Sequence, residues 1–216
     1  MFNKIIDFFY DSKYPFYLKN REDVIFIHIT KTAGTSIRHS LDFNKVRGSS
    51  YSKHYHSKEV QQLVGAEKWD NAFKFSFVRN PWDRLFSYYR FKRRKKIEQG
   101  IQVPEFSHDE FRKWSFELIN HRYQNFEDRA KANFAPQKDW LINENNEVDL
   151  DFIGRFETLE EDFQKICQII GVNEKLKHHN QSIPVYNYFD YYEKDLMDLV
   201  ADFYKKDIEE FGYSFK

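Results

Sequence analysis

Residues 24–40 read VIFIHITKTAGTSIRHS, and this stretch decides the fold that we expect. The apolar run Val24–Ile29 predicts a buried strand, TKTAGTS predicts a tight loop, and the segment after it predicts the start of a helix. A helix start offers unpaired backbone N–H groups and the positive end of the helix dipole, which attract anions. Lys31 adds a positive charge to the loop. Thr32, Thr35 and Ser36 add hydroxyl donors. The stretch therefore predicts a phosphate-binding loop.

The composition of the 216 residues narrows the class of protein. The 34 basic residues balance the 34 acidic residues, so no overall charge draws the chain to nucleic acid or to a membrane, and an anion site must arise from local clustering. Cys167 is the only cysteine, which excludes an intramolecular disulfide and a cysteine-based metal cluster. Its apolar surroundings predict a buried structural thiol. The N-terminal residues contain no long apolar run, so we expect neither a signal peptide nor a transmembrane anchor.

Three short apolar runs predict the strands of one sheet. They are Val24–Ile29, Phe73–Val78 and Val148–Phe156, and each precedes a helical pattern. Strands that alternate with helices predict an α/β fold with a largely parallel central sheet flanked by helices. We also expect a helical insert over residues 107–142 and one or two amphipathic helices over residues 191–211, with Leu196, Leu199, Val200 and Phe203 on one face. The sequence has no repeat or linker, which favours a single domain.

Capping signals mark two of the helix starts. Asn80 and Pro81 predict the start of the helix after the second strand, because asparagine caps a helix and proline suits its first position. Thr158 and Glu161 have the spacing of a capping box, and Gly171 predicts the end of that helix.

A second cluster of cationic and hydroxyl side chains follows the second strand. Ligands of open α/β sheets bind at the carboxyl ends of the strands. Arg79 ends the second predicted strand, and Arg84 and Ser87 follow at a spacing that puts them on one face of the helix. Together with the loop after the first strand, Arg79 and Ser87 suit a ligand with two separate phosphate groups.

The first loop is not a Walker A loop. It lacks the first glycine, and Lys31 precedes Gly34 instead of following the last glycine. The sequence shows no strand that ends in an aspartate placed to hold Mg²⁺. A nucleoside triphosphatase is therefore disfavoured.

Two motifs resemble those of a known family. IFIHITKTAGTS (residues 25–36) resembles the 5′-phosphosulfate loop, and FSFVRNPWDRLFSYYRF (residues 75–91) resembles the 3′-phosphate motif, of PAPS-dependent carbohydrate sulfotransferases. This group includes heparan sulfate 2-O-sulfotransferase and its bacterial relatives. Weaker similarities lie at residues 133–141, 152–163, 178–182 and 207–213. The resemblance implies one sulfotransferase domain over residues 1–216 with a P-loop-like fold, and residues 1–22 form an N-terminal extension without a counterpart.

The resemblance also implies the donor and the residues that bind it. PAPS, 3′-phosphoadenosine 5′-phosphosulfate, would be the donor, and no metal would be required. Its 5′-phosphosulfate end would lie on the loop residues Lys31, Thr32, Ala33, Gly34, Thr35 and Ser36. Arg79 and Ser87 would hold its 3′-phosphate. Asn180 and Ser182 would contact the nucleotide.

Sulfuryl transfer requires a base for the acceptor hydroxyl and a cation for the charge that builds on the leaving phosphate. Lys31 suits the second role. His54 and His56 lie two residues apart in YSKHYHSKEV (residues 51–60), so in an extended segment both point to one face. A similar His-x-His pair in the 2-O-sulfotransferases assigns His56 as the base, with His54 orienting it or contacting the substrate. Glu59 is the alternative base.

The acceptor is harder to predict. The resemblance implies a saccharide. The run RFKRRKK (residues 90–96) is either a solvated helix end or, through Arg93 and Arg94, a track for an anionic acceptor. Arg84 is either a substrate ligand or a partner in a structural ion pair. Gln137 lies in one of the weaker motifs and is a further candidate for substrate binding.

The sequence therefore predicts a sulfotransferase that moves a sulfuryl group from PAPS to a saccharide hydroxyl. Two alternatives stay open: a P-loop-like kinase or phosphotransferase, and a catalytically silent module that binds nucleotides or polyanions. A nucleic-acid binder is disfavoured by the balanced charge. The lack of an anchor and of disulfides favours a bacterial cytoplasmic enzyme, while membrane-peripheral association and a truncated Golgi enzyme stay open, as do the oligomeric state and the identity of the acceptor.

Overall fold

The computed structural model describes residues 16–18, 21–43, 54–122, 133–177 and 186–215. The chain divides into two compact units. The sheet unit comprises Met1–Val78 and Asp139–Asn180, and the helical unit comprises Arg79–Lys138 and Gln181–Lys216. One sulfotransferase domain over residues 1–216 stays a prediction.

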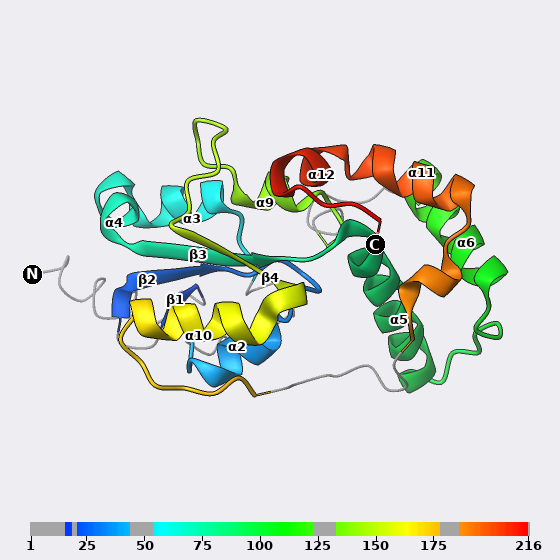
Figure 1. The fold of residues 1–216 in the computed structure, drawn as a ribbon, viewed down its shortest axis with the longest axis horizontal. Helices are drawn as coiled ribbons and strands as arrows, with labels where there is room; N and C mark the ends of the chain where they lie inside the picture. The colour runs from blue at the N-terminus through cyan, green and yellow to red at the C-terminus, as the bar shows by residue number, and fades with distance from the viewer. Residues whose placement is uncertain (1–15, 19–20, 44–53, 123–132, 178–185, 216) are drawn as a thin grey trace, which may run out of the picture. The chain divides into compact units, whose positions relative to one another are not determined.

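The sheet unit is built on four strands in the order β1-β2-β3-β4 (Figure 1). They are β1 (Tyr17–Leu18), β2 (Arg21–Ile27), β3 (Phe73–Val78) and β4 (Phe152–Arg155). β1 is antiparallel to β2, whereas the pairs β2–β3 and β3–β4 are parallel. Helices α3 (Ser57–Val64) and α4 (Ala66–Asn71) cover one face of the sheet, and α2 (Gly34–Ser40) and α10 (Leu159–Ile169) cover the other (Figure 1). The predicted α/β class, with a largely parallel sheet flanked by helices, is confirmed.

The core of the sheet unit lies between the strands and the helix pair α2 and α10. Alternate residues of β2 and β3, among them Phe26 and Phe75, pack in one cluster with Ile37 of α2 and Ile166 of α10. The adjacent residues of these strands are buried as well, as expected for parallel strands covered on both faces. Cys167 belongs to this core, and burial raises the pKa of its thiol. Its prediction as a buried structural residue is confirmed.

The predicted capping box of α10 is wrong. The Thr158 hydroxyl donates to Asp162 Oδ2 at 2.7 Å, and the same oxygen accepts the backbone N–H of Arg155 at 2.9 Å. A short 3₁₀ turn over Phe156–Thr158 precedes α10 and changes the local geometry. The end of the helix is confirmed, because Gly171 follows α10 with a φ of 69°.

The helical unit contains four α-helices that lie wholly within its described part. They are α5 (Pro81–Glu98), α6 (His108–Glu117), α11 (Lys194–Phe203) and α12 (Lys205–Phe211), with the π-helix η2 (Leu118–Arg122) and the 3₁₀ helix η4 (Tyr188–Tyr191). The predicted start of α5 is confirmed, since Asn80 Oδ1 accepts the N–H of Trp82. The helix α9 (Gln137–Leu141) contains the division between the units.

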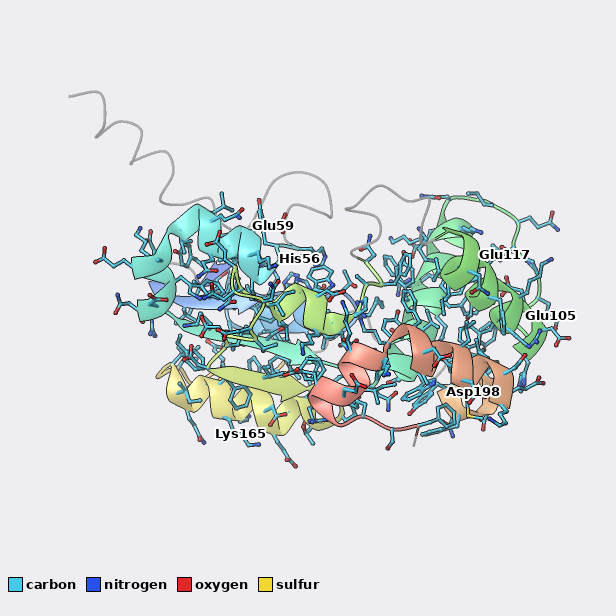
Figure 2. The ribbon with its side chains drawn as sticks, turned by 90° about the horizontal axis from the view of Figure 1, so that it is seen from above. His56, Glu59, Glu105, Glu117, Lys165 and Asp198 are labelled. Carbon is cyan, nitrogen blue, oxygen red and sulfur yellow. The ribbon has the colours of Figure 1, made fainter. Side chains whose placement is uncertain are left out.

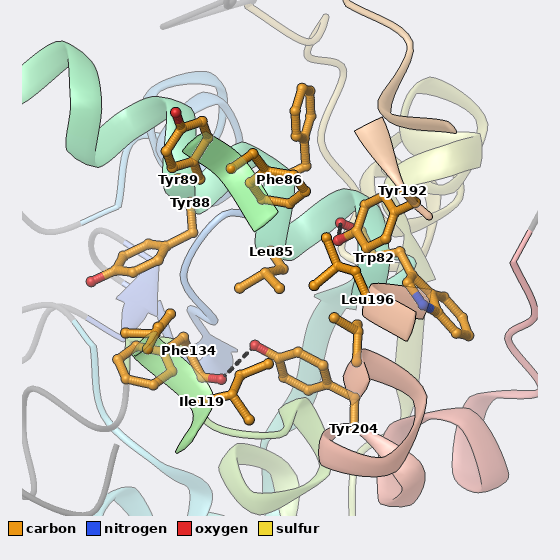
Figure 3. Close-up of a cluster of buried hydrophobic side chains, with 13 residues drawn as sticks. Trp82, Leu85, Phe86, Tyr88, Tyr89, Ile119, Phe134, Tyr192, Leu196 and Tyr204 are labelled. Carbon is orange, nitrogen blue, oxygen red and sulfur yellow. Dashed lines mark hydrogen bonds between the residues drawn. The ribbon is translucent and has the colours of Figure 1, made fainter. Parts of the chain in front are cut away.

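An aromatic cluster forms the core of the helical unit (Figure 3). Leu196 and Val200 of α11 are fully buried in it, as the amphipathic pattern predicts. Two of its buried tyrosine hydroxyls donate to backbone carbonyl oxygens, Tyr192 to Trp82 at 2.8 Å and Tyr204 to Phe134 at 2.7 Å. These bonds satisfy the polar ends of side chains that otherwise contribute apolar surface. Among the described residues, no helix has both the length and the apolar character needed to span a membrane.

Candidate functional site

The loop between β2 and α2 turns sharply. Lys31 and Ala33 have φ values of 67° and 63°, which lie in the left-handed region. The hydroxyl of Thr32 is buried and donates to the carbonyl oxygen of Ile29 at 3.0 Å. Thr32 therefore stabilises the turn through its side chain. A backbone that alternates between left-handed and right-handed conformations turns successive N–H groups toward one point, which suits an anion.

Gly34 lies directly against a histidine ring. A Cβ atom added to Gly34 would be 1.9 Å from Cδ2 of His28. The His28 side chain is buried, and its ring stacks on Phe26 with 5.5 Å between the centroids. Only glycine allows the loop to approach the ring this closely. The place of His28 in an apolar strand predicts a structural residue, but the sequence did not show its contact with Gly34.

The predicted pair of histidines lies beside the same strand end. His54 Nδ1 is 2.8 Å from the carbonyl oxygen of His28, and the two ring centroids are 4.3 Å apart. The His56 ring stacks on Trp140 with a centroid separation of 4.5 Å and an interplanar angle of 26°. The sheet unit therefore brings the loop after β2 and the histidine pair together through His28.

His56 is the N-cap residue of α3 and forms a capping box with Glu59 (Figure 2). The Glu59 carboxylate accepts the backbone N–H of His56 at 2.7 Å. Burial lowers the pKa of the His56 imidazole, while the charge of Glu59 and a hydrogen bond to the backbone of Asp139 oppose this shift. Glu59, predicted as the alternative base, thus has a capping role in this structure.

The other predicted donor-binding cluster lies in the helical unit. Arg79 Nε donates to Asp83 Oδ2 at 2.7 Å, and Ser87 lies one turn after Asp83 on α5. The backbone of Arg79 pairs with the Gln137 side chain: Gln137 Oε1 accepts the Arg79 N–H, and Gln137 Nε2 donates to the Arg79 carbonyl oxygen, both at 2.8 Å. Gln137 is fully buried, and its backbone N–H donates to Asp207. Its observed contacts hold Arg79 in place and give no support to a role in substrate binding.

The remaining predicted substrate residues also have contacts within the helical unit. Arg84 is buried, and its guanidinium donates to the carbonyl oxygens of Ala135 at 2.9 Å and Asn133 at 3.4 Å. Burial lowers the pKa of this guanidinium. These contacts are structural. The guanidinium of Arg93 lies over the Phe106 ring, and Arg94 forms an ion pair with Glu98 on its own helix.

The predicted residues thus divide between the units. The sheet unit holds Lys31, Thr32, Ala33, Gly34, Thr35, Ser36, His54 and His56, and the helical unit holds Arg79, Arg84, Ser87, Arg93, Arg94 and Gln137. Asn180 and Ser182 lie outside the described residues. Within the described ranges, no group of three or more histidine, cysteine, aspartate or glutamate side chains could hold a metal ion.

Comparison with known proteins gives three matches. A sequence model described as the sulfotransferase family matches residues 14–214. An uncharacterized protein of Archaeoglobus fulgidus is 30% identical over 117 residues, which cover 54% of this chain and 82% of that protein. The crystal structure of a sulfotransferase from Alicyclobacillus acidocaldarius matches with a TM-score of 0.35 and 12% sequence identity, and covers 93% of this chain and 88% of the other. A structural likeness this weak adds nothing to the assignment.

Proposed function

The chain belongs to the sulfotransferase family, and we propose that it transfers a sulfuryl group from PAPS to a hydroxyl group of a saccharide. The observation that carries the proposal is the loop after β2, with the His28 ring against Gly34 and the histidine pair beside it. The loop offers a site for an anion, and a histidine offers a base, within one compact unit.

The residues of the loop fit the 5′-phosphosulfate end of the donor. The left-handed turns at Lys31 and Ala33 orient the backbone, and Gly34 has no Cβ to obstruct it. Lys31 and Thr35 are half-buried, so their polar ends can reach a ligand at the loop. The Lys31 ammonium would stabilise the charge that develops on the leaving phosphate oxygen.

Arg79 and Ser87 are proposed to bind the 3′-phosphate. The Asp83 carboxylate and the Gln137 amide fix the side chain and the backbone of Arg79, respectively. A guanidinium that is already oriented loses less conformational entropy when it binds a phosphate.

The proposed reaction conserves atoms and charge without a metal ion. A histidine removes the proton of the acceptor hydroxyl while the acceptor oxygen forms a bond to sulfur. The bond between sulfur and the bridging phosphate oxygen breaks, and its electron pair leaves with 3′-phosphoadenosine 5′-phosphate, PAP. The imidazolium then releases the proton to solvent. The products are a sulfate ester, PAP and a proton.

Incubation with PAPS and a panel of glycans, followed by mass spectrometry, tests the proposal. We expect a mass gain of one sulfate on at least one glycan. PAP should raise the unfolding temperature without Mg²⁺, since a ligand that binds only the folded state stabilises it. Stabilisation by ATP and Mg²⁺ alone would favour a phosphotransferase, and PAP binding without transfer would favour a silent module. The nearness to heparan sulfate 2-O-sulfotransferase and the cytoplasmic location stay predictions.

A further inference from the structure

We propose that His54 is the general base of the transfer and that His56 caps α3, an assignment that rests on the proposed function. It departs from the sequence prediction, which gave the role of base to His56. Both histidines lie in the sheet unit, two residues apart. Both rings contact Trp140, His54 with its edge and His56 by stacking, and their hydrogen bonds distinguish them.

The hydrogen bond of His54 determines which nitrogen carries its proton. Nδ1 lies 2.8 Å from the carbonyl oxygen of His28. A carbonyl oxygen only accepts, so Nδ1 carries the proton and donates it. In the neutral imidazole the lone pair then lies on Nε2, the nitrogen farther from the backbone. A base needs a fixed ring with a known basic nitrogen, and the bond to His28 provides both.

The same contacts place His54 next to the donor loop. The ring of His28 contacts the ring of His54 and also lies directly against Gly34 of the loop. His28 is buried, so this arrangement has little freedom to shift. The His28 side chain therefore fixes the position of His54 relative to the loop.

His56 has contacts that explain it as a structural residue. It is the N-cap of α3, and its backbone N–H donates to the Glu59 carboxylate. Its ring stacks on the fully buried Trp140 and forms a hydrogen bond with the backbone of Asp139. Burial also lowers the pKa of this imidazole. These contacts join α3 to the segment that contains Trp140.

The proposed step is a single proton transfer coupled to sulfuryl transfer. His54 Nε2 takes the proton of the acceptor hydroxyl as the acceptor oxygen bonds to sulfur. The bond from sulfur to the phosphate oxygen breaks, and its electron pair stays on PAP. The resulting His54 imidazolium keeps its Nδ1–H bond to the His28 carbonyl oxygen and returns the Nε2 proton to solvent.

Asparagine at each position gives a matched pair of variants. In His54→Asn, the side-chain amide can replace the Nδ1–H donor toward His28, but no basic nitrogen remains. In His56→Asn, a preferred N-cap residue replaces the imidazole. We expect His54→Asn to lower the turnover at least about 100-fold with unchanged stabilisation by PAP. We expect His56→Asn to keep turnover within about threefold of wild type.

A measurement on the ligand-free protein tests the geometry without activity. Long-range ¹H–¹⁵N correlation spectra identify the imidazole tautomer, and the spectrum of His54→Asn assigns the His54 signals. We expect the Nδ1–H tautomer for His54. The Nε2–H tautomer would overturn the assignment, and so would turnover that survives in His54→Asn but is lost in His56→Asn. A wild-type protein that neither binds PAP nor transfers sulfate would overturn the proposed function itself.

Discussion

At the scale of single residues, the contact between His28 and Gly34 is the most constrained feature of the site. The ideal Cβ position of Gly34 lies 1.9 Å from the ring, so Gly34→Ala must displace the ring or the loop. We expect it to lower the free energy of unfolding by about 1–3 kcal/mol and to weaken the stabilisation by PAP. Urea unfolding and a thermal shift with PAP measure the two effects.

The double variant His28→Ala/Gly34→Ala provides the control for this contact. Without the ring, the added methyl group has space, so the second substitution should cost less than it does in wild type. Equal costs in both backgrounds would show that the ring does not limit the loop.

His56 should also make the free energy of unfolding depend on pH. Burial lowers the pKa of His56 below its ordinary value of 6.5, against the opposing effects of Glu59 and Asp139. The unfolded chain then binds more protons than the folded chain, so the contribution of His56 to stability is present above that value and is lost as the pH falls below it. Relative to His56→Asn, wild type should become less stable between about pH 7.5 and about pH 5.5. Urea unfolding of both proteins measures this difference, and a constant difference would contradict the prediction.

At the scale of elements, local signals predicted where α5 and α10 start, but not the hydrogen bonds that cap α10. Asn80 and Pro81 act within one turn, so sequence alone sufficed. Thr158 and Glu161 had a suitable spacing, but Asp162 attracts both the Thr158 hydroxyl and the N–H of Arg155. The competing bond depends on how β4 ends, and sequence spacing does not show that.

Asp162 therefore stabilises the junction of β4 and α10, and Glu161 does not. Asp162→Ala should lower the free energy of unfolding by about 1–3 kcal/mol, because the Arg155 N–H, the Thr158 hydroxyl and the Lys165 ammonium lose their acceptor. The matched control Glu161→Ala, at an exposed neighbouring position, should change it by less than about 0.5 kcal/mol. Urea unfolding compares the two variants. A larger loss of unfolding free energy in Glu161→Ala than in Asp162→Ala would favour the capping box of Thr158 and Glu161.

At the scale of the whole molecule, periodicity and motifs predicted the α/β class and the family, because both depend on patterns within short segments. The support of Arg79 could not be predicted, because it joins segments far apart in the chain. Asp207 accepts the backbone N–H groups of Gln137 and Lys138, and Gln137 in turn holds the backbone of Arg79. The distinction between His54 and His56 likewise depends on His28, 26 residues before His54.

The hydrogen bonds that Asp207 accepts from Gln137 and Lys138 lead to a prediction for the helical unit. Asp207 is fully buried, so Asp207→Ala leaves buried donors unpaired and should lower the free energy of unfolding by about 2–4 kcal/mol. It should also weaken PAP binding through Arg79. The control Asp202→Ala, at an exposed position of α11, should do neither. Urea unfolding and titration with PAP measure both effects. Unchanged PAP affinity at a temperature where the variant is folded would show that Asp207 does not influence PAP binding.

Sulfate transfer by wild type and by His54→Asn is the decisive measurement for the proposed reaction and its base. Each protein is incubated with PAPS and the glycan panel, and the glycans are analysed by mass spectrometry. We expect a gain of one sulfate with wild type and a loss of that product with His54→Asn, while PAP stabilises both proteins equally. Wild-type protein that binds PAP but adds sulfate to no acceptor would contradict it.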